Sequence, residues 1–259
     1  MEIKPIKKLG QNFLNSKRVV KEMIEAADLR PGDFVLEIGP GFGILTKEIA
    51  KTAKKVVAVE KDKRLADFLK QELNRCGNVK IINKDILQIT DYELQTADYK
   101  LISSLPFYIA SAVIKKFLED KNPPKQMVLI VQKEVAQRIT AKPPKMNLLS
   151  IFVQIYSEPK IISYIPKECF SPKPKVTSAL IKITPFRDRP GLSQMQEFSK
   201  IVKAGFSSPR KQLVNNLSKE LKKSKPQIAQ WLKENNINPN QRAQTLSIED
   251  WLNLCNKPD

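Results

Sequence analysis

The sequence contains no histidine, and its three cysteines, Cys76, Cys169 and Cys255, are separated by long stretches of chain. Histidine is the side chain most often used for general acid–base catalysis, so mechanisms that depend on it are excluded. The cysteine spacing matches none of the common zinc sites, and we expect neither a bound metal nor a structural disulfide. Any catalysis must therefore depend mainly on binding and positioning.

Long apolar runs are absent as well. No run approaches the roughly 20 residues that cross a membrane, and the first residues carry Lys4, Lys7 and Lys8 where a secretion signal has its apolar core. We therefore expect a soluble cytoplasmic protein that does not associate with membranes. The length of 259 residues and the 41% apolar content suffice for one full domain and a small appendage.

Positive charge is abundant: 45 Lys and Arg residues oppose 27 Asp and Glu residues, giving a net charge of +18. This excess indicates a polyanionic partner, although a solvated lysine-rich surface is an alternative explanation. A basic stretch from Lys142 to Lys175 also contains Phe152, Tyr156, Tyr164 and Phe170. Basic groups interleaved with aromatic rings are typical of surfaces that contact a nucleic-acid backbone and stack on its bases.

Short apolar segments alternate with segments of helical periodicity in the first two thirds of the chain. This alternation predicts an α/β fold with a mostly parallel, Rossmann-like sheet and helices on both faces. Ligands of such sheets bind at the carboxyl ends of the strands. We expect strands at 34–39, 56–60, 79–82, 101–102 and 127–131, and helices at 44–50, 64–73 and 110–118.

The alternation stops near residue 187, and the remaining sequence is helical in its periodicity. Ser247 and Asp250 resemble a capping box that opens a last helix reaching Leu254. We therefore expect an α/β domain over 1–187 and a small all-helical domain over 188–259.

A glycine-rich turn, Gly39, Gly41 and Gly43, follows the first expected strand, and the acidic residues Glu60 and Asp85 close the next two. Glycines allow a sharp turn and close approach to a ligand, and a carboxylate after the second strand suits the hydroxyls of a ribose. The third glycine comes one residue earlier than in the dinucleotide pattern. This difference favours S-adenosylmethionine over NAD, because its cationic methionine end needs no phosphate cradle.

The segment Ser104, Leu105, Pro106 and Phe107 follows the fourth expected strand and predicts the acceptor. The lone pair of an exocyclic purine amine is delocalised into the ring. The Ser104 hydroxyl and the Leu105 carbonyl could accept its hydrogens and free the lone pair for attack. Pro106 would fix the turn and Phe107 would stack on the base. In-line attack on a methyl group needs positioning more than a general base.

These motifs and several others resemble the rRNA adenine N6,N6-dimethyltransferase family, the KsgA-like enzymes. The resemblance covers nearly the whole chain. The matching segments are residues 9–14, the glycine-rich turn 37–43, Glu60 and Asp85, the tetrad 104–107, the late motif 170–179, and residues 206–211 and 242–247.

The resemblance implies roles for individual residues. It makes Ser104 to Phe107 catalytic, and it implies adenine dimethylation in small-subunit (16S) rRNA of immature 30S subunits during ribosome biogenesis. Nothing in the sequence demands more than a monomer. The cofactor-binding residues it implies are Asn12, Leu14, Gly39, Gly41, Glu60, Asp85, Ile86 and Ser104. The substrate-binding residues are Phe107, Phe170, Lys173, Lys175, Arg210 and Lys211, the last two in the helical domain.

The chain departs from the family pattern at two places. Ser104 stands where the family has asparagine, with Ser103 before it in place of glycine or alanine, and residues 145–150 differ from the usual Tyr-Gly-x-Leu-Ser. Two alternatives therefore stay open: a non-catalytic assembly factor that binds pre-rRNA, and an Erm-like methyltransferase of large-subunit rRNA. The late motif at Phe170 and the helical-domain matches favour the KsgA-like enzymes over the latter.

Overall fold

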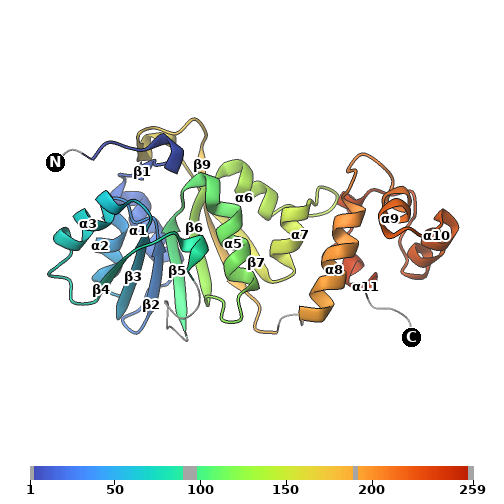
Figure 1. Cartoon of the computed structure of the whole chain (residues 1–259), viewed down its shortest axis with the longest axis horizontal. Helices are drawn as coiled ribbons and strands as arrows, with labels where there is room; N and C mark the ends of the chain where they lie inside the picture. Colours follow the sequence, from blue (N-terminus) through green and yellow to red (C-terminus); the bar gives the residue numbers. More distant parts are fainter. Residues whose placement is uncertain (1–2, 90–97, 189–191, 256–259) are drawn as a thin grey trace. The chain divides into compact units, whose positions relative to one another are not determined.

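The computed structural model describes residues 3–89, 98–188 and 192–255. The chain divides into two compact units, Met1–Gln137 with Ser157–Pro185, and Arg138–Tyr156 with Phe186–Asp259 (Figure 1). The division into domains at residue 187 stays a prediction. By its contacts, however, the segment Arg138–Tyr156 groups with the helical unit and not with the α/β unit that contained it in the sequence-based division.

The first unit is built on a sheet whose strand order, over the described residues, is β4-β3-β2-β5-β6-β9-β7. Neighbouring strands from β4 to β6 are parallel, while β9 pairs antiparallel with both β6 and β7. The predicted α/β class is confirmed. The two antiparallel strands at one edge of the sheet, β9 and β7, were not among the expected strands. The strands are β2 (Phe34–Ile38), β3 (Lys55–Glu60), β4 (Val79–Asn83), β5 (Tyr99–Ser104), β6 (Gln126–Gln132), β7 (Ser157–Ile165) and β9 (Ser178–Pro185).

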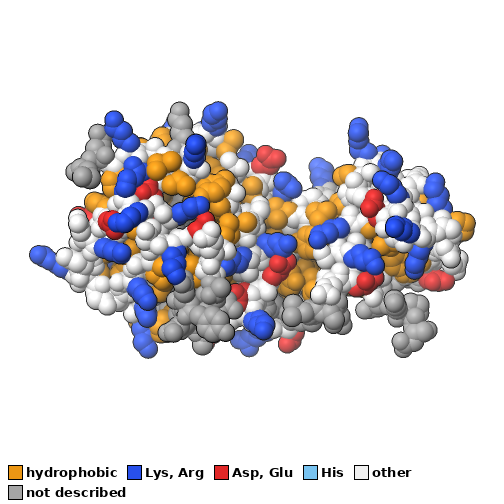
Figure 2. Space-filling view, in the orientation of Figure 1, with side chains coloured by type: hydrophobic (Ala, Val, Ile, Leu, Met, Phe, Trp, Pro, Cys, Tyr) orange, Lys and Arg blue, Asp and Glu red, His pale blue; other side chains and the backbone are white. Residues whose placement is uncertain are grey.

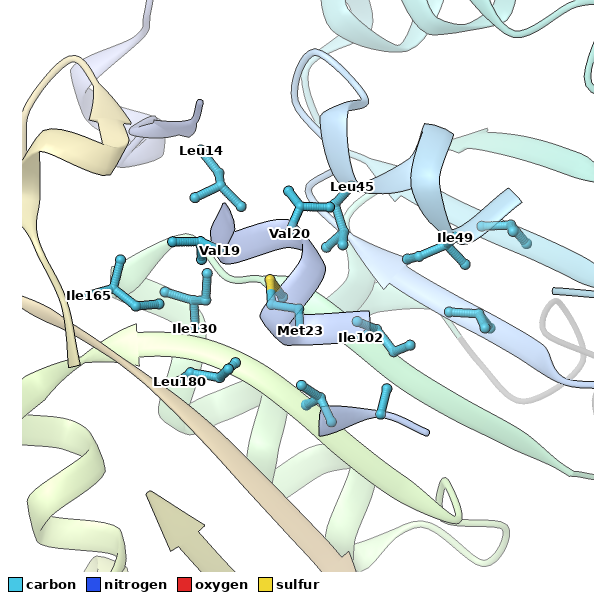
Figure 3. Packing of buried hydrophobic residues seen from close by; sticks show 14 of the residues in the cluster. Leu14, Val19, Val20, Met23, Leu45, Ile49, Ile102, Ile130, Ile165 and Leu180 are labelled. Atoms are coloured by element: carbon cyan, nitrogen blue, oxygen red, sulfur yellow. The ribbon is translucent and has the colours of Figure 1, made fainter. Parts of the chain in front are cut away.

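Helices cover both faces of this sheet. Val19, Val20 and Met23 of α1 pack with Ile102 of β5 in one buried cluster (Figure 3). On the opposite face, Phe117 of α5 contacts the ring of Tyr99, which alternates with Ile102 along β5. The helices of this unit are α1 (Lys17–Ala26), α2 (Ile44–Ala50), α3 (Lys63–Glu72), α5 (Ala110–Glu119) and α6 (Lys133–Ile139), which crosses into the second unit.

The direction of winding reverses between β2 and β5. From β2 the chain continues through β3 and β4 on one side, and β5 and β6 lie on the other. Only Phe34–Leu36 of β2 pair with β5, so the two strands separate towards their carboxyl ends. The Ser103 hydroxyl bridges this opening by donating to the Ile38 carbonyl at 2.6 Å. A ligand pocket is expected at such a switch point.

A short two-stranded sheet connects the amino-terminal arm to a distant loop. β1 (Phe13–Leu14) pairs antiparallel with β8 (Phe170–Ser171), so that Leu14 faces Phe170. Both side chains belong to the buried cluster that contains α1, with exposures of 8% and 3%. Burial of these two residues holds the arm against the body of the unit.

The second unit is helical. It contains α7 (Leu148–Gln154), α8 (Leu192–Gly205), α9 (Leu213–Leu221), α10 (Lys225–Glu234) and α11 (Ile248–Asn253). The predicted capping box is confirmed, because Ser247 and Asp250 each accept a hydrogen bond from the other's backbone. Asn147 caps α7 in the same reciprocal way with Ser150. The divergent stretch 145–150 is therefore a helix start, and the Met146 amide joins it to Gln244 in the same unit.

Candidate active site

A pocket opens in the first unit at the switch point between β2 and β5. It contains about 710 Å³ of space, its open mouth included. Its walls are the turn after β2, the carboxyl ends of β3, β4 and β5, and residues 9–13 of the amino-terminal arm. The predicted residues Asn12, Gly39, Gly41, Glu60, Asp85, Ile86 and Ser104 to Phe107 all line it.

The glycine turn brings the backbone close to two other walls. Gly39, Gly41 and Gly43 all have positive φ, at 66°, 59° and 77°. A Cβ at Gly39 would lie 3.3 Å from the ring of Pro106, and one at Gly41 would lie 2.8 Å from the ring of Phe13. A side chain at either glycine would therefore be strained by its backbone and would crowd the pocket wall.

Glu60 lies at the end of β3, and its side chain is 6% exposed. One carboxylate oxygen accepts the Asp62 amide at 2.9 Å, and the other accepts the Gly41 amide at 3.3 Å. Burial raises the pKa of Glu60 above its ordinary value, while these amides act in the opposite direction. Glu60 therefore fixes the glycine turn to β3 and still presents its carboxylate to the pocket.

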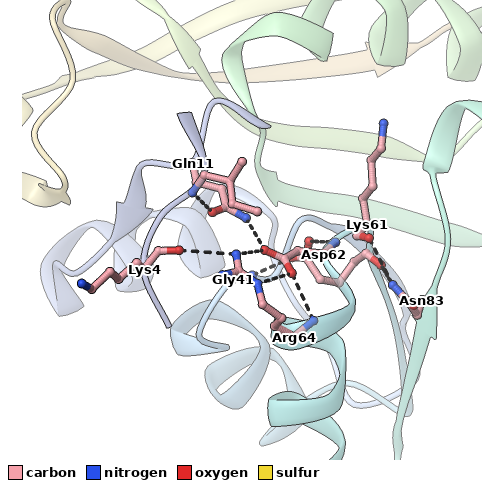
Figure 4. Close-up of polar contacts among 9 residues, drawn as sticks. Lys4, Gln11, Gly41, Lys61, Asp62, Arg64 and Asn83 are labelled. Carbon is pink, nitrogen blue, oxygen red and sulfur yellow. Dashed lines mark hydrogen bonds and ion pairs between the residues drawn. The ribbon is translucent and has the colours of Figure 1, made fainter. Parts of the chain in front are cut away.

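Asp62 fastens the arm to the rim (Figure 4). Its carboxylate accepts hydrogen bonds from the side-chain amide of Gln11 at 3.0 Å and from the guanidinium of Arg64 at 2.7 Å. Arg64 also donates to the Lys4 carbonyl at 3.4 Å, and the Ile6 amide donates to Gln11 at 2.6 Å. The hydrogen bond from Arg64 is the main cause that lowers the pKa of Asp62 to about 2.

Asp85 and Ile86 form the wall beyond β4. Asp85 begins the short helix η2 (Ile86–Gln88) and accepts the Leu87 amide at 3.0 Å. The Lys61 ammonium lies 2.8 Å from the other oxygen of Asp85 and lowers the pKa of that carboxyl. Ile86 is 3% exposed and supplies apolar surface. The wall thus combines a charged acceptor with an apolar patch, which suits an adenine ring and its amine.

The tetrad forms the opposite wall. Ser104 ends β5, and the Leu105 amide donates to the Ile130 carbonyl at 3.2 Å, which extends the pairing with β6 beyond the strand. Pro106 packs on Gly39, and Phe107 begins the short helix η3 (Phe107–Ile109). Tyr108 follows on the rim with 55% of its side chain exposed. The residues predicted to bind the acceptor and those predicted to bind the cofactor therefore line one pocket.

Glu37 is a candidate that the sequence analysis did not select. It lines a second hollow of about 340 Å³ that shares Asn12, Gly39 and Ser104 with the first. Glu37 is 2% exposed, and no donor among the described residues reaches its Oε2. Burial raises the pKa of Glu37 to about 8; the Thr46 hydroxyl acts in the opposite direction, and the charge of Glu60 adds to the increase. The feature of the sequence that could have identified Glu37 is its position as the acidic residue at the start of the glycine motif.

Several predicted substrate residues lie elsewhere. Leu14 lines the second hollow. The Phe170 ring lies in the core and is not among the lining residues of either hollow, so its contact with the acceptor base stays a prediction. The cause of its burial is its pairing opposite Leu14, which turns the ring inward. Lys173 and Lys175 are exposed in the loop after β8, where Lys173 pairs with Glu168. Arg210 and Lys211 belong to the second unit.

Residues 4–258 match the model of a family described as ribosomal RNA adenine dimethylase. The chain belongs to this family. The resemblance stated from the motifs is confirmed, and with it the predicted methyl transfer from S-adenosylmethionine to rRNA adenines.

Relatives within this family share much of the sequence. The chain is 43% identical to ribosomal RNA small subunit methyltransferase A of Dehalococcoides mccartyi over 259 residues, covering 98% of this chain and 88% of the relative. It is 40% identical to the protein of the same name from Alkaliphilus oremlandii, covering 98% and 92%.

Two solved structures have a similar fold. A dimethyladenosine transferase from Plasmodium falciparum is similar with a TM-score of 0.79 and 24% identity, over 93% of this chain and 95% of that chain. The 23S rRNA methyltransferase ErmE is similar with a TM-score of 0.77 and 24% identity, over 94% and 98%. These likenesses show the fold.

The pocket fits S-adenosylmethionine by its own chemistry. The glycine turn packs closely on Pro106 and Phe13, where a Cβ would crowd the pocket wall, and Oε2 of the buried Glu37 has no donor among the described residues in the adjoining hollow. Glu60 and Asp85 add two further carboxylates around the same pocket. A cation with a ribose and an adenine ring matches these groups.

Replacing Glu60 tests the cofactor wall. We expect Glu60→Ala to weaken S-adenosylmethionine binding by about 1.5 to 3 kcal/mol, because hydrogen bonds to a charged group are lost. Isothermal calorimetry measures this change. Asp67→Ala, which removes an exposed carboxylate from α3, is the matched control and should bind normally. Unchanged affinity in Glu60→Ala would refute the assignment.

Replacing Phe170 separates a core role from base contact. Phe170→Ala should lower the free energy of unfolding by about 3 to 5 kcal/mol because it leaves a cavity, and Phe170→Leu should cost about 1.5 kcal/mol or less. Denaturant unfolding measures both. If Phe170 acts only in the core, the Phe170→Leu protein should retain methyl transfer. A stable Phe170→Leu protein without activity would show that the ring contacts the base.

Proposed function

We propose that this protein dimethylates the N6 amines of adenines in small-subunit ribosomal RNA, acting as a monomer on immature small subunits in the cytoplasm. The proposal is supported mainly by the observation that Glu60 and Asp85 line the same pocket as Ser104 to Phe107, on opposite sides of it. The relatives at 40 to 43% identity are named for the small subunit. The net charge of +18 suits an RNA partner.

Different residues of the pocket bind the cofactor and the acceptor. Bound S-adenosylmethionine supplies an electrophilic methyl group. Glu60 would hold the ribose hydroxyls, and Asp85 with Ile86 would hold the adenine of the cofactor. Gly39 would let Pro106 pack directly on the glycine turn and keep this wall of the pocket free of a side chain, since a Cβ there would lie 3.3 Å from the proline ring. Asn12 and the arm cover the pocket and reduce the access of water.

We assign the methionine ammonium to Glu37. This carboxyl is buried, lacks a donor to Oε2 among the described residues, and lies beside the hollow that joins the pocket. Its raised pKa means that the unliganded protein retains the proton at neutral pH. A cation placed there favours the ionised carboxylate, so binding releases that proton.

Ser104 and the Leu105 carbonyl orient the acceptor amine. Both accept hydrogens of an adenine that has left its base stack, and Phe107 stacks on its ring. The serine side chain is shorter than that of asparagine and offers a hydroxyl oxygen as acceptor in place of an amide oxygen. Positive charge develops on the amine during attack, so an acceptor within reach stabilises the transition state.

Substitutions at Ser104 test catalysis. The wild type should transfer methyl groups to immature small subunits, and Ser104→Ala should reduce kcat by about 10- to 100-fold because an acceptor for a charged donor is lost. Ser104→Asn should restore activity. Methyl incorporation and mapping of methylated adenines measure these outcomes. If only Ser104→Asn turns over, the natural protein is an assembly factor.

The pH dependence of binding tests Glu37. Between pH 6 and 7 the amine of the cofactor stays protonated while Glu37, with a pKa of about 8, is mostly neutral. Affinity should therefore rise about tenfold per pH unit, with about one proton released per molecule bound. Calorimetry in buffers of different ionisation enthalpy measures the release. Glu37→Gln should bind more weakly with no pH slope, and a slope that persists in this variant would contradict the assignment.

A further inference from the structure

Tyr164 forms an exposed aromatic site outside the pocket. It lies near the end of the edge strand β7, and 49% of its side chain is exposed. The Lys133 ammonium lies 5.0 Å from the centre of its ring. Neither residue lines the pocket, and the reaction described above does not use them.

A β-bulge gives Tyr164 its direction. In the pairing of β7 with β9, Ile161 lies opposite Ile181, but Ser163 lies opposite Leu180, so Ile162 is an extra residue. Without it, Tyr164 would lie opposite Ser178 and point to the other face, because a slip of one residue exchanges the faces of a strand. The bulge therefore turns Tyr164 towards Lys133 and places Ile165 in the core.

The same register aligns Tyr164 with the reaction site. Ser104 of β5 lies opposite Ile130 of β6, which lies opposite Leu180 of β9, which lies opposite Ser163 of β7. At the next position, Val131 of β6 lies opposite Ala179 of β9, which lies opposite Tyr164 of β7. Three strand spacings of about 4.8 Å place β7 about 14 Å from β5. A few stacked nucleotides at about 3.4 Å each span this distance.

The surface around this edge is basic. The loop that joins β8 to β9 carries Lys173 and Lys175, both exposed, and its end is tied to α6 by the Lys133 amide, which donates to the Thr177 carbonyl. On the face of the molecule drawn in Figure 2, Lys and Arg side chains predominate over Asp and Glu side chains. A phosphate backbone is attracted to such an edge, while Tyr164 offers it a flat ring.

We propose that Tyr164, with Lys133 against its ring, is a stacking platform for an RNA base a few nucleotides from the target adenine. The proposal rests on the proposed function, because it takes the adenine in the pocket as the fixed point of the RNA. The ring stacks on the base without reading its edges, so the platform selects for an unpaired nucleotide and not for a sequence. Lys133 holds the ring by a cation–π contact.

Binding and kinetics test the platform together. Fluorescence anisotropy with a labelled single-stranded RNA dodecamer of adenines should show that Tyr164→Ala raises Kd by about 5- to 150-fold, the effect of removing one base–aromatic stack. In methylation of small-subunit rRNA, KM should rise by a similar factor with kcat unchanged. Calorimetric affinity for S-adenosylmethionine should be unchanged.

Three comparisons keep the test specific. Tyr164→Trp should restore both Kd and KM, because it keeps a stacking ring. The dependence of Kd on salt should be the same in Tyr164→Ala and the wild type, since no phosphate contact is lost. Phe186→Ala removes another exposed ring, which follows β9 at its far end and is 45% exposed, and should change nothing.

Two results would overturn the platform: an unchanged Kd and KM in Tyr164→Ala, or a Tyr164→Trp protein as weak as Tyr164→Ala. A wild type that transfers no methyl group to small-subunit rRNA would instead overturn the proposed function. The dodecamer measurement then still decides whether Tyr164 stacks on RNA.

Discussion

The buried carboxylate of Glu60 is the constraint on which the site depends. It is held at the end of β3 and accepts amides from both the glycine turn and Asp62. Asp62 in turn binds Gln11 and Arg64, which fasten the amino-terminal arm. The carboxylates of Glu60 and Asp62 thus connect the glycine turn, the end of β3 and the amino-terminal arm, and each of these segments lines the pocket. Burying this charge is costly unless hydrogen bonds compensate it, which explains why two backbone amides converge on it.

Two buried carboxyls lie close together at this end of the sheet, and they differ in their partners. Glu60 has two amide donors, whereas no donor among the described residues reaches Oε2 of Glu37. The charge of Glu60 also opposes ionisation of Glu37. Such an arrangement is unfavourable by itself and becomes favourable when a cation arrives, because the cation supplies the missing partner. The local electrostatics therefore suit a cationic cofactor better than an anionic dinucleotide.

Elements with strong local signals were predicted well. β3 and β6 are continuous apolar runs, the turn after β2 has its glycines, and α11 has its capping box, so short-range patterns specify them. β7 and β9 are not among the expected strands. β7 has no continuous apolar run and carries Ser157, Glu158, Pro159 and Lys160 in its first half, and its pairing with β9 makes it a strand. The burial of Phe170 was not predictable from its own motif, because it depends on pairing with β1, more than 150 residues earlier in the chain.

By itself, the sequence determined the family, the cofactor, the α/β class and most residues of the pocket, because those residues lie in short motifs at the ends of strands, where each motif specifies its own backbone. Tertiary structure alone decided which side chains reach the pocket and which enter the core. Pro106 closing on Gly39, the arm fastened through Asp62, the unpartnered oxygen of Glu37 and the outward ring of Tyr164 all follow from contacts between distant segments or from strand register. Such contacts depend on packing and pairing across the sheet, which no local pattern encodes.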